Sequence, residues 1–137
     1  MVDENAYGLT ARKLVLEEQG HTIIIAKTIP QALDSFAHGA FDLVITDHKM
    51  PRMNALDFIV ALREEKPAIR IILLSGIADA LGLTAENTGA DAVLQKSAQE
   101  APQLVRLVAS VLAKKSPSKR KPAATEPLAP KAKRHSA

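Results

Sequence analysis

The chain lacks cysteine and tryptophan, and its aromatic residues are three Phe and one Tyr. Without cysteine it cannot form disulfide bonds, thiolate zinc sites or a cysteine nucleophile. It also lacks an apolar run of membrane-spanning length, and it lacks the basic start and apolar segment of a signal peptide. We therefore expect a cytoplasmic protein whose core consists of Leu, Ile, Val and Ala.

Positive charge is concentrated near the C-terminus. The net charge of the 137 residues is +3, but residues 115–137 contain seven Lys or Arg and one Glu, a net of +6, which leaves −3 for residues 1–114. This tail has a single large aliphatic residue, Leu128, so it cannot bury enough apolar surface to offset the entropy of ordering. We expect a folded domain at 1–114 and a disordered basic tail at 115–137. Because the tail has no aromatic side chains for base stacking, no nucleic-acid partner is expected.

Two kinds of apolar segment alternate along residues 1–114. Helical periodicity and helix boundary signals predict helices at 7–19, 30–36, 56–65, 78–87 and 102–113. Runs of aliphatic residues predict strands at 22–26, 43–46, 69–74 and 92–94. Strands that alternate with helices are typical of a parallel sheet covered by helices on both faces, and continuous apolar strands fit burial on both sides.

Polar residues stand where the predicted strands end. Asp47 follows one strand, Ser75 follows the next, and Lys96 comes shortly after the last, while Asp3 and Glu4 precede the first helix. Each has an ordinary structural explanation when taken alone, as a turn former, a helix cap or a solvated side chain. Ligands of such sheets bind beyond the carboxyl ends of the strands, so the convergence of these groups favours a functional site.

The chemistry of this set is consistent with phosphoryl transfer. Clustered carboxylates repel one another unless a cation neutralises them, and oxygen ligands of this kind suit Mg²⁺. A carboxylate can attack phosphorus to form an aspartyl-phosphate, whose oxygens then need a cation and a hydroxyl donor.

Five motifs together resemble the receiver domain of bacterial two-component response regulators over about residues 2–114. They are VDEN at 2–5, DLVITDHKMP at 42–51, ILLSG at 72–76, TGAD at 88–91 and LQK at 94–96. The resemblance implies an α/β, flavodoxin-like fold with a doubly wound parallel five-stranded sheet of order 2-1-3-4-5 and five helices. It also implies a signalling domain rather than an enzyme. Because we see no second folded domain after residue 114, we expect a stand-alone receiver that acts by binding a partner.

The resemblance also implies the roles of individual residues and the partners. Asp47 is the expected phospho-acceptor, which receives its phosphoryl group from a sensor histidine kinase or phosphotransfer protein and signals to a downstream protein. Ser75 and Lys96 are expected to bind the phosphoryl group. The expected Mg²⁺ ligands are Asp3, Glu4, Asp47 and the backbone carbonyl of Lys49.

The chain departs from the family pattern at several positions. Val93 stands where the family has its switch aromatic, Ser97 replaces the usual proline, and Ala55 replaces a glycine, which predicts strain if that position needs a positive φ. Only Met1 and Val2 precede the acid pair, so we expect a first strand that is stunted and acids that are poorly held. Our hypothesis is that the true start of the protein lies upstream of Met1.

The sequence has to be weighed against three other functions. The departures favour a degenerate receiver fold that binds partners without phosphorylation, whereas the presence of Asp47, Ser75 and Lys96 together disfavours it. A haloacid-dehalogenase-like phosphatase also uses an Asp after a strand, but it needs a second Asp where this chain has Lys49. A nucleotide-binding fold is disfavoured because no glycine-rich phosphate loop is present.

Overall fold

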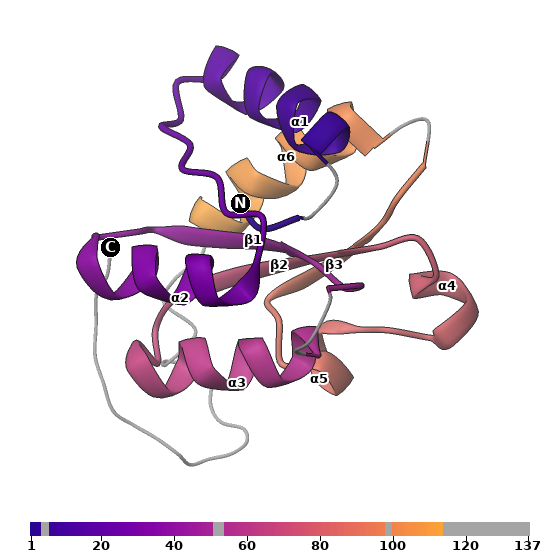
Figure 1. Cartoon of the computed structure of the whole chain (residues 1–137). Helices are drawn as coiled ribbons and strands as arrows, with labels where there is room; N and C mark the ends of the chain where they lie inside the picture. The colour runs from indigo at the N-terminus through magenta and orange to yellow at the C-terminus, as the bar shows by residue number, and fades with distance from the viewer. Residues whose placement is uncertain (4–5, 51–53, 98–99, 114–137) are drawn as a thin grey trace.

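The computed structural model of the chain describes residues 1–3, 6–50, 54–97 and 100–113. Three strands form a parallel sheet in the order β1-β2-β3 (Figure 1). The elements in chain order are α1 (Ala6–Glu18), α2 (Ile29–His38), β1 (Leu43–Asp47), α3 (Ala55–Glu65), β2 (Arg70–Ser75), α4 (Ala78–Leu81), α5 (Ala85–Thr88), β3 (Ala92–Gln95) and α6 (Glu100–Ala113). The predicted basic tail at 115–137 lies outside the described residues, and no described helix is long and apolar enough to cross a membrane.

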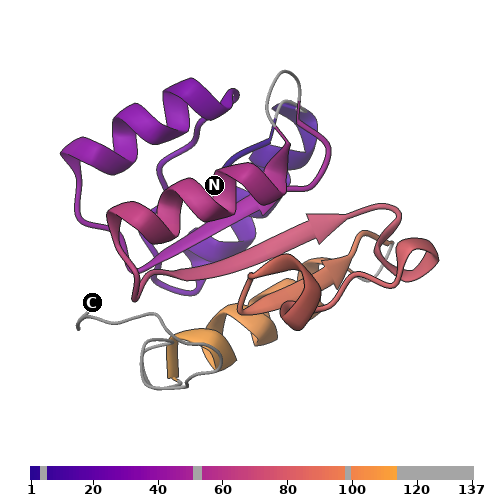
Figure 2. The same cartoon turned by 90° about the horizontal axis from the view of Figure 1, so that it is seen from below.

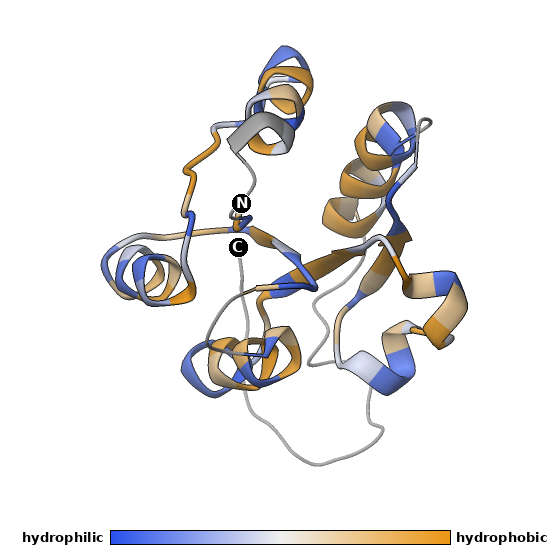
Figure 3. Cartoon of the chain, turned by 45° about the vertical axis from the view of Figure 1, so that its right-hand side comes forward, coloured by the Kyte–Doolittle hydropathy of each residue, from blue (hydrophilic) through white to orange (hydrophobic). Residues whose placement is uncertain are grey.

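Helices cover both faces of the sheet because successive strand residues point to opposite sides. Val44, Ile71 and Leu73 belong to a core cluster with α2 and α3, while Ile72 and Leu74 belong to a second cluster with α1 and α6. Figure 2 shows α2 and α3 side by side on one face, and Figure 3 shows apolar helix surfaces turned toward the sheet. The prediction of a parallel sheet buried on both sides is therefore confirmed.

The first strand of the expected five-stranded order is reduced to a single bridging residue. Val2 lies between Ala26 and Thr46 and makes one parallel bridge to each. Its N–H donates to the Ile45 carbonyl at 2.7 Å, and its carbonyl accepts from the Asp47 N–H at 2.8 Å. A single bridging residue agrees with the expectation of a stunted first strand, and Val2 lies between the segment at Ala26 and β1. The described sheet has three strands, so the expected five-stranded order stays a prediction.

The strand predicted at 22–26 does not form as a regular strand. Only Ala26 makes a bridge, and no regular secondary structure is assigned to residues 21–25. The backbone bonds on this side run from Met1 to Ile24 and between Met1, Asp3 and Ala26. β-branched residues favour a strand only when a neighbouring strand pairs with them, and here the pairing ends at Met1.

A cavity of about 420 Å³ lies beside Met1. It separates the segment 20–24 from the start of β1, and Leu16 of α1 and Val108 of α6 also line it. Ile24, next to it, remains 48% exposed. The interruption in pairing is therefore accompanied by a gap in packing on the α1 and α6 side of the sheet. Residues 22–26 thus lack both the continuous backbone hydrogen bonds of a strand and full apolar contact with the core.

The helix predicted at 78–87 is divided into α4 and α5. Gly82 has a φ of +65° and ends α4 in the left-handed conformation, which glycine adopts without steric cost. Thr84 then begins α5 with a capping box, in which its side chain and that of Asn87 each accept a backbone N–H. The sequence prediction of one helix was wrong because both a stop and a start signal lie inside it.

The strain predicted at Ala55 is not present. Ala55 is the first residue of α3, so it has a helical backbone, and it is fully buried. Asn54 caps this helix by accepting the Leu56 N–H at 2.7 Å. A positive φ is therefore not required at this position.

Candidate functional site

Asp47 ends β1 at the carboxyl edge of the sheet, where its side chain is buried next to an ammonium group. Its Oδ1 lies 2.5 Å from Lys96 Nζ, and the whole residue is only 6% exposed. The backbone places Lys96 there because its N–H donates to the Ser75 carbonyl at 2.9 Å, just beyond β3. Parallel strands end at the same edge, so Asp47 and Lys96, which are 49 positions apart in the chain, meet as the sequence predicted.

Asp3 brings a second carboxylate to the same ammonium. Its Oδ2 lies 3.6 Å from Lys96 Nζ and 2.8 Å from Arg12 Nη1, and the residue is 2% exposed. The expectation of poorly held acids is therefore wrong for Asp3, since two cations and the backbone bond to Ala26 fix it. Glu4, the other predicted acid, lies outside the described residues.

Ser75 ends β2 and is almost completely buried, at 1% exposed. Its Oγ accepts the Ile77 N–H at 3.1 Å and lies 3.2 Å from His48 Nδ1. His48 directly follows Asp47, and its N–H donates to the Leu74 carbonyl at 2.7 Å. The hydroxyl is thus held between a loop amide and an imidazole, at the strand end next to that of Asp47.

The donor set fits a hard cation. Lys96 Nζ is within 4 Å of oxygens from both Asp3 and Asp47, so a positive charge already occupies the space between the two carboxylates. Mg²⁺ prefers one or two carboxylates together with waters and other oxygens. The described residues include no group of three or more acidic, His or Cys side chains suited to a metal, so Asp3, Asp47, Glu4 and the Lys49 carbonyl all stay predicted ligands.

Lys49 and Val93 occupy different surroundings. Lys49 is exposed and lies beyond the end of β1. Val93 pairs with Leu73 in the sheet and packs, partly buried, against the α2 and α3 core cluster. Val93 is thus a short, branched side chain at the position where the family pattern led us to expect an aromatic.

The sequence prediction missed three side chains near the site: Arg12, His48 and Glu100. Arg12 of α1 binds Asp3, and its Nε also binds Glu100 Oε2 at the start of α6. Desolvation lowers the pKa of Arg12, but hydrogen bonds and charge from Glu100 and Asp3 outweigh it, so the pKa is raised overall. Helical periodicity contained a signal for Arg12, because it lies three residues after Leu9 and four before Leu16, which are both buried.

The chain belongs to the response regulator receiver domain family, because the model of that family matches residues 1–109. It is thus a receiver domain of two-component signalling, and receiver domains are signalling modules rather than conventional enzymes. The family membership agrees with the parallel α/β fold and with an acidic site at the carboxyl edge of the sheet.

Similar solved structures support the fold. The response regulator protein TrrA from Thermotoga maritima, in complex with Mg(2+)-BeF, is 29% identical, with a TM-score of 0.72 over 80% of this chain and 94% of that chain. A response regulator receiver domain protein from Clostridium thermocellum is 25% identical, with a TM-score of 0.70 over 81% of this chain and 90% of that one.

Curated relatives are much longer than the matched region. The alginate biosynthesis transcriptional regulatory protein AlgB of Pseudomonas aeruginosa is 27% identical over 75 residues, which are 55% of this chain and 17% of the relative. The sensory/regulatory protein RpfC of Xanthomonas campestris is 38% identical over 61 residues, or 44% of this chain and 8% of the relative. This chain therefore spans less than a fifth of their length.

Proposed function

We propose that the domain accepts a phosphoryl group on Asp47 from a phosphohistidine of a sensor histidine kinase or phosphotransfer protein. The observation that carries this proposal is the contact of 2.5 Å between Asp47 Oδ1 and Lys96 Nζ at the carboxyl edge of the sheet. A second buried carboxylate and a buried hydroxyl, those of Asp3 and Ser75, lie at the same edge. The complex of the related TrrA protein with Mg(2+)-BeF agrees with a metal-dependent site of this kind.

The geometry of these side chains supports the following transfer step. An Asp47 carboxylate oxygen attacks phosphorus, the P–N bond of the phosphohistidine breaks, and its electron pair stays on the imidazole nitrogen, which takes up a proton from solvent. Lys96 then balances the negative charge on the phosphoryl oxygens, and Ser75 donates a hydrogen bond to one of them. Burial of Asp47 limits the access of water to the new acyl phosphate.

Mg²⁺ would be held by Asp3, Asp47, Glu4 and the Lys49 carbonyl. It would supply positive charge that neutralises the carboxylates and the phosphoryl oxygens. The other roles belong to the protein's own groups. Asp3 provides the second carboxylate at the edge, and Lys96 moves from the Asp47 carboxylate to the phosphoryl group.

Intact mass spectrometry tests this proposal directly. We expect the full chain, incubated with Mg²⁺ and the small phosphodonor acetyl phosphate, to gain the mass of one phosphoryl group. Addition of EDTA should prevent the gain, since the metal is then removed. A folded protein that gains no mass under any Mg²⁺ concentration would refute the proposal.

A second candidate function is binding without phosphorylation. It is favoured by the two cations, Arg12 and Lys96, that already neutralise the buried acids, and by the short side chain of Val93. In that case the downstream protein would recognise a single conformation of the domain. Absence of phosphoryl gain in a folded protein is the outcome that would select this function.

His48 should weaken phosphorylation by competing for the Ser75 hydroxyl. Because a net hydrogen bond contributes about 1 kcal/mol, we expect His48→Ala to raise the ratio of phosphorylated to free protein about fivefold at a fixed subsaturating acetyl phosphate concentration. Mass spectrometry at steady state measures this ratio. His38→Ala is the matched control, since His38 is exposed in the last turn of α2, where it pairs with Asp34. An unchanged or lower ratio for His48→Ala would show that His48 does not restrain Ser75.

A further inference from the structure

Arg12 is a buried cation that joins the acid site to two helices. The residue is 8% exposed, although arginine is rarely buried without charged partners. Its Nη1 donates to Asp3 Oδ2 at 2.8 Å, and its Nε donates to Glu100 Oε2. Asp3 and Glu100 are 97 positions apart in the chain, so a single guanidinium connects the N-terminal acid to the first residue of α6.

The backbone of α1 leaves space for this guanidinium. Gly8 lies one turn before Arg12, and a Cβ placed on Gly8 would come within 2.9 Å of Arg12 Nη1. Glycine inside a helix costs about 1 kcal/mol relative to alanine, so the position has no helical advantage. The space beside Gly8 is occupied by Arg12 Nη1, the same nitrogen that binds Asp3. The absence of a side chain at Gly8 therefore makes room for the contact between Arg12 and Asp3.

Among the residues that the structure describes, the charges around the site are nearly balanced before any metal binds. Asp3, Asp47 and Glu100 contribute three carboxylates, and Arg12 and Lys96 contribute two cations. Asp3 Oδ2 is the shared point, because it contacts Arg12 and lies 3.6 Å from Lys96 Nζ. A divalent ion that binds Asp3 must therefore approach a carboxylate that already has two positive neighbours.

We propose that Arg12 acts as an internal counter-ion that opposes Mg²⁺ at Asp3, and that Glu100 sets the strength of this opposition by drawing the guanidinium toward α6. The proposal rests on the proposed function, since it concerns the same metal site. Arg12 is a positioning residue here: it tunes the affinity for Mg²⁺ through Asp3 and does not contact the reacting atoms. Repulsion between like charges a few ångströms apart in a buried site supplies the physical basis.

The alternative is that Arg12 only ties α1 to α6. The two explanations differ in the signs of their effects on Mg²⁺ affinity. Removing the guanidinium frees Asp3 and should tighten Mg²⁺ binding, whereas removing the Glu100 charge leaves Arg12 paired with Asp3 alone and should weaken it. A purely structural tie would give both variants lower stability, with no opposite changes in affinity.

Titration of the full chain with Mg²⁺, followed by calorimetry or by NMR shifts, measures these changes. We expect Arg12→Gln to lower the Mg²⁺ Kd about three- to tenfold and Glu100→Gln to raise it by a similar factor, as expected for one buried charge interaction. Lys13→Gln is the matched control on α1, because Lys13 forms a half-exposed pair with Glu17 at 3.2 Å. Its Kd should stay within about twofold of the wild-type value, since exposed pairs contribute little.

Gly8→Ala provides a test that does not depend on removing a buried charge. The added methyl group displaces Arg12 Nη1 while it favours the helix, so we expect tighter Mg²⁺ binding in a protein that remains folded. Circular dichroism checks the fold of each variant. If Arg12→Gln fails to fold, the opposite signs expected for Gly8→Ala and Glu100→Gln still decide the question.

The outcomes also separate this inference from the proposed function. If the wild type binds Mg²⁺ and Arg12→Gln, Gly8→Ala and Glu100→Gln all leave the Kd unchanged or move it in the same direction, the inference is overturned and the proposed function stands. If only Arg12→Gln or Gly8→Ala binds Mg²⁺, the inference is supported. If the wild type and all variants fail to bind Mg²⁺ while folded, both the inference and the metal-dependent function are overturned.

Discussion

Asp47→Asn should abolish the gain of phosphoryl mass completely in the presence of Mg²⁺ and acetyl phosphate. The amide oxygen of Asn carries no negative charge and is a poor nucleophile, so the step that forms the acyl phosphate is lost. The effect should exceed that of any other single substitution at the site, because Lys96, Asp3 and Ser75 only stabilise charge or orient groups. Intact mass spectrometry at saturating phosphodonor measures it.

Asp42→Asn is the matched control for this prediction. Asp42 immediately precedes β1 and is exposed, whereas Asp47 ends the same strand and is buried. The control should gain one phosphoryl group as the wild type does, and both variants should retain the circular dichroism spectrum of the parent. Phosphoryl gain that persists in Asp47→Asn and vanishes in another Asp variant would place the acceptor elsewhere.

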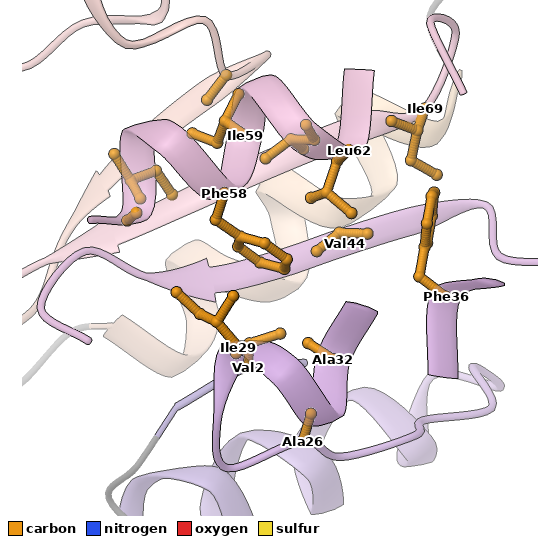
Figure 4. Close-up of a cluster of buried hydrophobic side chains, with 14 residues drawn as sticks. Val2, Ala26, Ile29, Ala32, Phe36, Val44, Phe58, Ile59, Leu62 and Ile69 are labelled. Carbon is orange, nitrogen blue, oxygen red and sulfur yellow. The ribbon is translucent and has the colours of Figure 1, made fainter. Parts of the chain in front are cut away.

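Phe58→Ala should lower the free energy of unfolding by about 3 to 5 kcal/mol, which is the usual cost of truncating a buried Phe. Phe58 is fully buried on the inner face of α3. Figure 4 shows its ring directed at Ile29 and Val2, between α3 and the α2 side of the core. Small domains have a total stability of about 5 to 15 kcal/mol, so this loss is a substantial part of the whole.

Urea denaturation followed by circular dichroism measures this loss. Val60→Ala is the matched control, because Val60 lies on the same helix but is 56% exposed. Its effect should stay within about 0.5 kcal/mol, as is usual for exposed positions. A loss below about 1 kcal/mol for Phe58→Ala would mean that the cluster around Val2 contributes little to stability, in conflict with the burial of its members.

Local sequence patterns predicted most of the elements. The apolar runs of β1 and β2, the apolar face of α3 and the long C-terminal helix were located to within a few residues. The site edge was also predicted, because parallel strands place their carboxyl ends together and Asp47, Ser75 and Lys96 follow or end those strands. Each of these inferences depends on the periodicity of apolar residues, or on which residues follow a strand, within one stretch of the chain.

The failures involve interactions between distant segments. Residues 22–26 have strand-forming side chains, yet their pairing stops at Met1, and a strand needs a neighbour along its whole length. Arg12, His48 and Glu100 were missed because each acquires its role from a partner outside its own element. Residues 78–87 are the exception, since Gly82 and Thr84 are local signals that the sequence reading did not weigh against helix periodicity.

The sequence by itself therefore determined the alternation of helices and strands, the doubly covered parallel sheet and the edge at which the acids gather. The tertiary structure alone decided which cations neutralise those acids and where the ladder beside Val2 ends. The physical reason is that periodicity and the succession of helices and strands along the chain are local properties, whereas an ion pair between Arg12 and Glu100, 88 positions apart, exists only after α1 and α6 pack together.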